Sequence, residues 1–438
     1  MSGPSSQFGG IWCCELELSG VTGVSAVSPP TPQQRMARVL VRLHSEPMGY
    51  VEVERTGDTV DLRRVVAAAW GRFGDRLRAH LVAEGLGFDR SSRPVPATSG
   101  CPHRTPAGGP ISVVVCTRNR AQILRGCLER LRAVTYPAAE FIVVDNAPQD
   151  GQTRDVVAAL AETDDRFRYL LAAQPGLSRA RNLGLSHAGG TYVAYTDDDV
   201  SVDPLWLDGL IRGFQRRPAT GCVTGLVCTA SITTGAEAYF DARAASWSTR
   251  CEPQVFDLVE HRPAEAMYPY SAGIFGTGAN VAFDRAFLRE IGGFDEALGA
   301  GTPTRGGEDL DMFVRVVRAG RALVYEPSAL VWHHHRADDE SLRRQMFSYG
   351  TGLTAYLTKL LLQPDTRGDV LRRVPLGVRR MARIRGTTVD RLHGRVAPPR
   401  GAMLREFAGF AAGPLLYRRA LRVIRASARG PAGRGRIR

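Results

Sequence analysis

The sequence predicts an α/β fold with a doubly wound, mixed but mostly parallel sheet, and three observations support this. Apolar, β-branched runs alternate with segments of helical spacing between residues 111 and 196. Polar side chains directly follow the runs at 111–116, 141–145 and 191–196. The runs themselves are continuously apolar, as buried parallel strands are. Because parallel strands end at one edge of a sheet, the polar groups are expected to meet there.

Each element of the predicted domain follows from its pattern. The predicted strands span residues 111–116, 141–145, 168–171, 191–196 and 221–228. The predicted helices span residues 123–131, 155–161, 177–188 and 308–318. Residues 231–270 have no regular period and are expected to be irregular. Two short strands, 321–325 and 329–332, precede a histidine triplet.

Changes in composition divide the chain into five predicted regions: residues 1–35, 36–90, 91–109, 110–340 and 341–438. The first is rich in Gly, Ser and Pro and is expected to be disordered or an over-long start, with Met36 as the alternative beginning. The second is a small α+β unit without recognisable chemistry, and the third is a linker. The fourth is the main domain, and the fifth is a helical, Arg-rich C-terminal extension.

The positive charge is concentrated at the C-terminal end. From residue 366 to residue 438, 19 arginines face 3 acidic residues, and this surplus of 16 exceeds the net charge of +13 of the whole chain. Arginines beside apolar residues predict contact with an anionic membrane surface. The alternative is a helix packed on the main domain with a solvated Arg face. Nucleic-acid binding is not expected, because no aromatic stacking module accompanies the arginines.

The eight cysteines include no CxxC pair. They are expected to be reduced and mostly buried, and a zinc site is not expected. No apolar run is long enough to span a bilayer, and the first residues lack the features of a signal peptide. The predicted location is the cytoplasm, with peripheral attachment to the inner face of the membrane.

Three adjacent carboxylates, Asp197, Asp198 and Asp199, follow the strand at 191–196. Burying them unpaired would be costly, so they are expected at the mouth of the strand, facing water or a cation. Hard oxygen ligands suit Mg²⁺ or Mn²⁺, whose shell is completed by substrate phosphates. A nucleotide lying along this edge would meet Asp145 through a base N–H or a ribose hydroxyl. The alternative is an acidic turn or a helix N-cap.

A set of short motifs between about residues 110 and 340 resembles the family 2 glycosyltransferases, which have a GT-A fold. Their order and spacing carry the resemblance, since each motif alone is weak. The motifs are Val-Val-Val-Cys-Thr-Arg-Asn-Arg (113–120), Val-Val-Asp-Asn (143–146), Pro-Gly-Leu-Ser-Arg-Ala-Arg-Asn (175–182), Thr-Asp-Asp-Asp (196–199), Gly-Thr-Gly-Ala-Asn (276–280), Gly-Gly-Phe-Asp-Glu (292–296) and Gly-Gly-Glu-Asp-Leu-Asp (306–311).

The resemblance implies a nucleotide-sugar site. The residues that it assigns to the nucleotide sugar are Thr117, Asn119, Asp145, Arg181, Asn182, Asp197 and Asp198. Asp145 would hold the base, and Arg181 is favoured for the diphosphate over a solvated helix face. Asp197 would lie nearer the ribose and Asp199 on the metal, with Asp198 as the intervening acid of the Asp-x-Asp pattern.

The same resemblance implies the catalytic and metal groups. Asp309 would be the general base, and Glu308 either binds the acceptor or is a first-turn acid of its helix. His333 would bind the metal, with His335 as its competitor. Gly278 and Asn280 would shape the sugar and acceptor pocket, or would only form a tight loop before a strand.

The predicted activity is inverting, metal-dependent transfer of a sugar from a nucleotide-diphosphate donor to a hydroxyl acceptor, with Mn²⁺ or Mg²⁺ as cofactor. The acceptor classes are a cell-envelope glycan, a lipid-linked saccharide or a metabolite. Two alternatives are a nucleotidyltransferase and a non-catalytic nucleotide-sugar-binding module. A nucleotidyltransferase would need a Gly-rich loop after the first strand, where this chain has Thr-Arg-Asn-Arg. The acid triplet together with the Glu-Asp helix start argues against a non-catalytic module.

Overall fold

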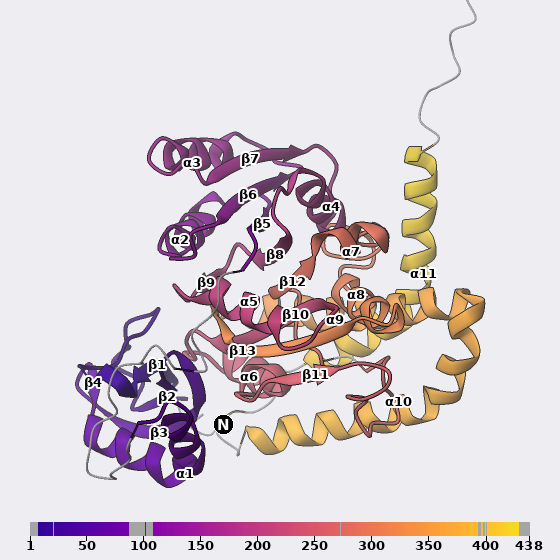
Figure 1. Ribbon diagram of the computed structural model, residues 1–438. Coiled ribbons are helices and arrows are strands. Elements are labelled where there is room, and N and C mark those ends of the chain that lie inside the picture. The colour runs from indigo at the N-terminus through magenta and orange to yellow at the C-terminus, as the bar shows by residue number, and fades with distance from the viewer. Residues whose placement is uncertain are drawn as a thin grey trace, which may run out of the picture.

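The computed structural model places one large sheet at the centre, a small N-terminal unit on one side of it, and long C-terminal helices on the other (Figure 1). The structure describes residues 8–20, 22–86, 101, 108–271, 273–392, 396, 399 and 401–428. The expected linker at 91–109 lies outside these residues except for 101, 108 and 109.

The central sheet has the strand order β11-β13-β10-β12-β8-β5-β6-β7, and β9 pairs with β13. Its strands are β5 (Ile111–Thr117), β6 (Ala139–Asn146), β7 (Phe167–Ala172), β8 (Tyr192–Asp197), β9 (Val200–Val202), β10 (Thr220–Thr229), β11 (Gln254–Phe256), β12 (Asn280–Asp284) and β13 (Ala322–His333). Strands β8, β5, β6 and β7 are parallel neighbours, and so are β10 and β13. Strand β12 is antiparallel to both of its neighbours. The predicted fold class, a mixed and mostly parallel α/β sheet, is confirmed.

Helices cover both faces of this sheet and give it two apolar cores. They are α2 (Ala121–Arg132), α3 (Gln152–Ala161), α4 (Leu177–His187), α5 (Trp206–Gln215), α6 (Gly235–Ser248), α7 (Arg285–Glu290) and α8 (Glu308–Arg318). On one face, Leu185 of α4 and Phe313 of α8 pack with Val114. On the other, Leu128 of α2 and Trp206 of α5 pack with Val115. The alternation of side chains along β5 thus supplies both cores.

The strand register brings the polar strand ends together. Thr117 lies opposite Asp145, and Cys116 lies opposite Asp197. Because β12 runs the other way, its first residue, Asn280, pairs with Thr196 at the same edge. The loop that precedes β12 therefore arrives where the parallel strands end.

Two predictions for the second half of the domain are wrong in detail. The stretch 231–270 is not wholly irregular, since it contains α6, whose start is a capping box in which Thr234 and Glu237 bond each other's backbone N–H groups. The two expected strands at 321–325 and 329–332 form one strand, β13. Its register against β10 shifts between Gly225 and Leu226, and this irregularity accommodates Pro327 within the sheet.

The N-terminal unit corrects the expected disorder over residues 8–20 and 22–35, whereas residues 1–7 and 21 lie outside the described residues. It contains β1 (Ile11–Glu17), a 3₁₀ turn (Leu18–Gly20), β2 (Met36–Leu43), β3 (Glu46–Thr56), β4 (Thr59–Val60) and α1 (Leu62–Ala83). Strand β1 pairs with β2 in parallel and sends Trp12, Cys14 and Leu16 into a core shared with α1. The alternation in Ile11–Glu17 buries enough apolar surface to order a segment whose overall composition suggested a tail.

The N-terminal unit is tied to the central sheet by buried ion pairs. Arg42 lies 2.6 Å from Asp203, and Arg38 lies 2.9 Å from Asp241 of α6. The backbone N–H of Ile11 also donates to the carbonyl of Ile232 at 2.7 Å. Separating the two units would leave these charged side chains buried without their partners, which is costly. The pairs therefore fix the N-terminal unit against α6 and the start of α5.

Three helices follow the main domain: α9 (Asp339–Leu362), α10 (Pro364–Arg391) and α11 (Ala402–Ala428). Helices α9 and α11 approach so closely that a Cβ at Gly409 would lie 2.3 Å from the carbonyl oxygen of Phe347. A Cβ at Gly307, whose φ is +91°, would lie 2.4 Å from the carbonyl oxygen of Gly352, so α9 also fixes the start of α8. No helix within the described ranges combines the length and apolarity needed to cross a membrane.

The prediction of reduced, mostly buried cysteines is confirmed. All eight cysteines fall among the described residues and are free, and seven of them are buried. Cys116 is the half-buried one.

Candidate active site

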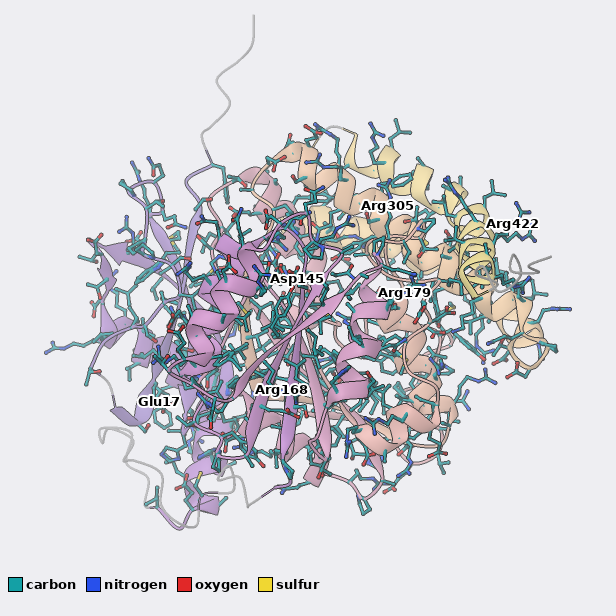
Figure 2. The ribbon with its side chains drawn as sticks, turned by 90° about the horizontal axis from the view of Figure 1, so that it is seen from above. Glu17, Asp145, Arg168, Arg179, Arg305 and Arg422 are labelled. Carbon is teal, nitrogen blue, oxygen red and sulfur yellow. The ribbon has the colours of Figure 1, made fainter. Side chains whose placement is uncertain are left out.

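A cavity of about 1140 Å³ lies between the carboxyl edge of the central sheet and the helices α6, α9 and α10. Its sheet side is lined by Asp197, Asp198, Asp199, Asp309 and His333. Figure 2 looks down on the molecule and shows Asp145 at the end of the central strands and Arg305 beside the C-terminal helices. The cavity is the place where the strand ends, the start of α8 and the C-terminal extension meet.

Asp197, Asp199 and His333 form a group that could hold a metal ion. One ligand atom from each lies within 4.8 Å of the others. Asp197 and His333 are partly exposed, and Asp199 is 9% exposed. Nε2 of His333 is 3.3 Å from Oδ1 of Asp199. Two carboxylate oxygens and one imidazole nitrogen, open on one side, fit a divalent cation that leaves positions for substrate oxygens.

The electrostatics of the group also fit a cation. Burial raises the pKa of the Asp199 carboxyl, but the hydrogen bond from His333 and the charge of Arg120 outweigh it and hold that pKa well below its usual range. Asp199 is therefore an anion at neutral pH. Burial raises the pKa of Asp197, and Arg181 opposes that shift.

Asp198 has a different role from its neighbours. Its Oδ2 accepts a hydrogen bond from Thr117 Oγ1 at 2.6 Å, and its Oδ1 accepts from Arg120. Burial raises its pKa to about 6, although Arg120 and Thr117 act in the opposite direction. Asp198 is thus held against β5, away from the metal group, and Thr117 holds it there while also lining the cavity.

Two arginines at this edge have no counterpart in the sequence prediction. Nη2 of Arg120 lies 2.9 Å from Oδ2 of Asp199, and Nη2 of Arg336 lies 3.4 Å from the same oxygen. Both line the cavity. Arg120 ends the first motif, and Arg336 directly follows the histidine triplet. Their positions just after two predicted strands could have identified them as site residues.

His335 supports His333. Its Nδ1 lies 3.2 Å from Nδ1 of His333, and its Nε2 lies 3.0 Å from Oγ1 of Thr229. Thr229 in turn donates to Asp241 at 2.6 Å, the carboxylate that also binds Arg38. His333 therefore presents the imidazole nitrogen that lies near the two carboxylates, and His335 links His333 through Thr229 to Asp241.

Arg181 lines the cavity and is bound by protein groups on its other sides, so the diphosphate contact expected of it stays a prediction. Its side chain is 3% exposed, and each end of the guanidinium meets a protein group. Nη1 lies 3.2 Å from Glu308, while Nη2 donates to the Gly278 carbonyl at 3.1 Å and lies 3.6 Å from Asp197. The guanidinium therefore connects the end of β8, the loop before β12 and the start of α8.

Asp309 and Glu308 begin α8 but point in different directions. Oδ2 of Asp309 accepts a hydrogen bond from the backbone N–H of Gly278 at 3.1 Å, and the carboxylate lines the cavity. Glu308 is buried and turned toward Arg181. Burial and the charge of Asp309 raise the pKa of Glu308 to about 7, against the opposing effect of Arg181. Asp309 is thus the accessible carboxylate of the pair.

Three predicted asparagines serve the scaffold. Asn280 is fully buried, and its amide bonds Leu226, Ala329 and the indole of Trp206. Asn182 exchanges two hydrogen bonds with the backbone of Phe294. Oδ1 of Asn119 accepts from the backbone N–H of Gln149 at 2.9 Å. None of these side chains lines the cavity, whereas Gly278 does, and the pocket roles expected of the three asparagines stay predictions.

Asp145 lies behind the acid group at the end of β6. Its side chain is buried, and Oδ2 accepts from the hydroxyl of Tyr169 at 3.1 Å. Oδ1 is buried and has no hydrogen-bond partner among the described residues. A ligand N–H or hydroxyl would satisfy this oxygen, which suits the role predicted for Asp145.

Comparison with known proteins supports the resemblance found in the sequence. Residues 112–267 match the model of the family described as "Glycosyl transferase family 2". A pre-mycofactocin glycosyltransferase of Mycobacterium tuberculosis is 29% identical over 238 residues, which are 53% of this chain and 45% of that protein. A glucosyl-dolichyl phosphate glucuronosyltransferase of Haloferax volcanii is 26% identical over 227 residues, 51% of this chain and 68% of that protein.

The chain spans about half the length of the first of these relatives. Among solved structures, a mannosyltransferase from Pyrobaculum calidifontis in complex with GDP-Man and Mn²⁺ is 18% identical, with a TM-score of 0.46. The match covers 86% of this chain and 100% of that one.

Replacing Arg181 with Met should destabilise the protein in a pH-dependent way. Arg181 lowers the pKa of both Glu308 and Asp197, so its loss raises their folded pKa values further above the unfolded ones. While Glu308 and Asp197 are protonated, removing Arg181 leaves no buried negative charge unpaired. Once they ionise, the missing guanidinium lowers the free energy of unfolding. The stability deficit should therefore be small at about pH 5 and grow as the pH rises through about 7, reaching about 3–5 kcal/mol. Thermal unfolding between about pH 5 and about pH 9 measures it.

Arg179→Met is the matched control, because Arg179 lies on the same helix but its pair with Glu296 is partly exposed. Its deficit should be about 0–1 kcal/mol at every pH. Two results would contradict the role of Arg181 as the partner of Glu308 and Asp197: an equal loss of stability in the two variants, or a loss in Arg181→Met that does not change with pH.

Proposed function

We propose that this chain, whose residues 112–267 match the family 2 glycosyltransferases, transfers a sugar from a nucleotide-diphosphate donor to a hydroxyl acceptor with inversion at the anomeric carbon. The observation that carries the proposal is one cavity in which the group Asp197, Asp199 and His333 shares a wall with the carboxylate of Asp309. The first group suits a metal-bound diphosphate, and the second suits a base that activates the acceptor.

The donor is proposed to lie along the carboxyl edge of the sheet. Its base reaches Asp145, whose buried Oδ1 needs a hydrogen-bond donor. Its diphosphate lies at Asp197 and Asp199, where Arg120 and Arg336 add positive charge. Expelling a nucleoside diphosphate leaves negative charge on that group, and these cations stabilise it.

The proposed metal is Mn²⁺ or Mg²⁺, held by Asp197, Asp199 and His333. When bound, it would neutralise charge on the leaving diphosphate. The imidazole favours Mn²⁺, because Mg²⁺ prefers a shell made only of oxygens. Asp198, held by Thr117 and Arg120, keeps the turn that carries the two ligating carboxylates in place.

Asp309 is proposed as the general base. The Gly278 N–H holds its carboxylate at the cavity wall, and Arg181 keeps Gly278 and Glu308 fixed around it. A Cβ at Gly278 would lie 3.2 Å or less from both Arg181 and Asp309, so a glycine lets the loop pass between them. A single base that activates the acceptor hydroxyl for direct attack on the anomeric carbon gives inversion.

Among the three acceptor classes, the cavity favours a lipid-linked saccharide. Away from the acids, apolar side chains of α9 and α10 line it: Leu353, Leu357, Leu361, Val370, Val374, Val378 and Met381. Arg373 and Arg380 lie among them. A wall of this kind suits an acyl or isoprenyl chain beside a phosphate. The exposed residues Leu404, Phe407 and Leu415 of α11 suit peripheral contact with an anionic membrane.

Asp309→Asn should abolish transfer while donor binding persists, because the amide keeps the shape but accepts no proton. The expected loss in turnover is about 10²–10⁴-fold. Transfer is measured across UDP-, GDP- and dTDP-sugars with Mn²⁺, and donor binding by calorimetry. Asp155→Asn, on the exposed side of α3, should behave as wild type. Normal turnover by Asp309→Asn would remove this residue as the base.

Chelation of divalent cations should stop transfer, and Mn²⁺ should restore it better than Mg²⁺. Asp199→Asn and His333→Ala should each weaken Mn²⁺ binding by at least about 10-fold in an electron paramagnetic resonance titration. His187→Ala, which removes an exposed histidine of α4, serves as the control. Full activity in excess chelator would refute the metal assignment.

Val374→Glu should impair transfer to a lipid-linked acceptor and leave donor hydrolysis unchanged, because it places a charge in the apolar part of the cavity. Val389→Glu is the matched control, an exposed valine of the same helix that does not line the cavity. Sedimentation with anionic vesicles tests membrane contact in parallel. Equal transfer by both variants would exclude an apolar tail bound at α10.

A further inference from the structure

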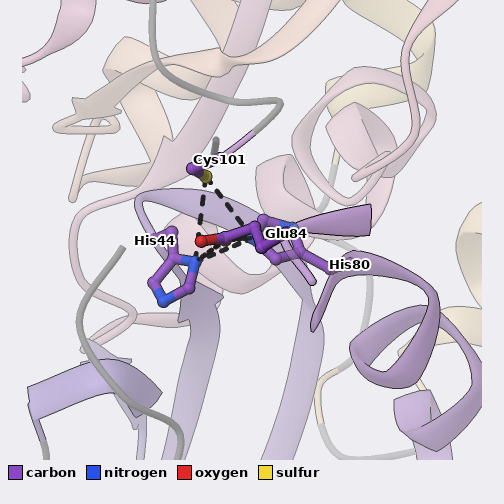
Figure 3. Close-up of side chains that lie close together, drawn as sticks. All are labelled: His44, His80, Glu84 and Cys101. Carbon is purple, nitrogen blue, oxygen red and sulfur yellow. Dashed lines mark hydrogen bonds and ion pairs between the residues drawn. The ribbon is translucent and has the colours of Figure 1, made fainter. Parts of the chain in front are cut away.

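A second cluster of metal-ligating side chains lies in the N-terminal unit, and none of its members lines the cavity of the candidate active site. It consists of His44, in the turn between β2 and β3, His80 and Glu84, at the end of α1, and Cys101 (Figure 3). One ligand atom from each residue lies within 4.8 Å of all the others. The four residues come from three separate segments, so helical or hairpin spacing alone does not explain their convergence.

The printed contacts define the centre of the cluster. Nδ1 of His44 lies 2.9 Å from Nε2 of His80, and Nε2 of His80 lies 2.9 Å from Oε1 of Glu84. Nδ1 of His44 also contacts that carboxylate oxygen. Sγ of Cys101 lies 3.8 Å from the His44 nitrogen and 3.7 Å from the His80 nitrogen. Two nitrogens, one oxygen and one sulfur thus face a common point.

The proton positions argue for a cation at that point. Nδ1 of His80 lies 3.0 Å from the Glu46 carboxylate, which can only accept, so this nitrogen carries the proton. Nε2 of a neutral His80 then presents a lone pair to the cluster, as does the carboxylate of Glu84. A carboxylate on the outer nitrogen of a histidine is the arrangement that orients metal-binding imidazoles.

The burial and the ligand types select zinc. The side chains of His44, His80 and Glu84 are 1%, 3% and 0% exposed, so the cluster is shielded from bulk solvent. A tetrahedral zinc with bonds of about 2.0–2.3 Å separates its ligands by about 3.3–3.6 Å. The sulfur distances match this to within a few tenths of an ångström. The two contacts of 2.9 Å need to open by about 0.4 Å, and the shorter contact between His44 and Glu84 needs to open further.

We propose that His44, His80, Glu84 and Cys101 bind one zinc ion as a closed, structural site. All four positions are protein ligands, which leaves no open position for a substrate. The ion ties the β2–β3 turn and the end of α1 to the chain segment that leads toward β5. The zinc ion also explains why the Glu84 carboxylate is buried beside the imidazoles of His44 and His80. Without a cation, these three groups would have to share protons.

Zinc content of the full-length wild-type protein is the primary test. After dialysis against a chelator that empties weak sites, plasma mass spectrometry should find about one zinc per chain, since structural sites bind far more tightly than open ones. Apoprotein reconstituted with Co²⁺ should show the near-ultraviolet charge-transfer band of a cobalt–thiolate bond. Neither measurement involves a nucleotide sugar, so its failure would leave the proposed transferase activity untouched.

Variants assign the ligands. Cys101→Ser should lose the cobalt–thiolate band, and Glu84→Gln should lower zinc occupancy. His333→Ala should change neither, and Cys116→Ala, which removes the half-buried cysteine of the other cavity, should keep the band.

Wild-type protein without zinc and without the cobalt band would overturn the proposal, even if Cys101→Ser failed to fold. An unchanged band in a folded Cys101→Ser protein would also overturn it. In that case a proton shared between His44 and Glu84 would be the remaining account of the cluster.

Discussion

Arg181 is buried beneath three parts of the chain that the sequence keeps far apart: the end of β8, the loop before β12 and the start of α8. Each contributes an acceptor to its guanidinium, Asp197, the Gly278 carbonyl and Glu308. A buried cation must be paired, and so must the carboxylates around it. The wall of the cavity that carries Asp197 and the wall that carries Asp309 therefore share one support. Moving either wall would leave a charge without its partner.

The sequence predicted those features that depend on local pattern. Continuous β-branched runs marked β5, β6 and β8, and the polar residues behind them marked the edge at which Thr117, Asp145 and Asp197 meet. The order of motifs indicated the family, because spacing between strand ends is constrained by the sheet. Asp309 at the start of α8 followed from the same reasoning, and its catalytic role remains a prediction.

What the sequence could not predict depends on direction and on distant partners. Asn182 and Asn280 have the residue type of ligand-binding positions, yet both satisfy backbone groups in the interior. Arg181 looks the same in sequence whether it faces a diphosphate or a buried carboxylate. The cluster around His44 could not be predicted because its members stand 36, 4 and 17 residues apart, and only the step from His80 to Glu84 is a common zinc-ligand spacing. The four side chains meet only when the turn, the helix end and Cys101 are folded together.

The contacts behind His333 have a consequence for how the chain is divided. His333 is held by His335, His335 by Thr229, Thr229 by Asp241, and Asp241 by Arg38 of the N-terminal unit. Cutting the chain at the start of the α/β domain would remove Arg38 and leave the buried Asp241, a member of this series of contacts, without its partner. The N-terminal unit therefore contributes to the position of His333, although it lies outside the α/β domain.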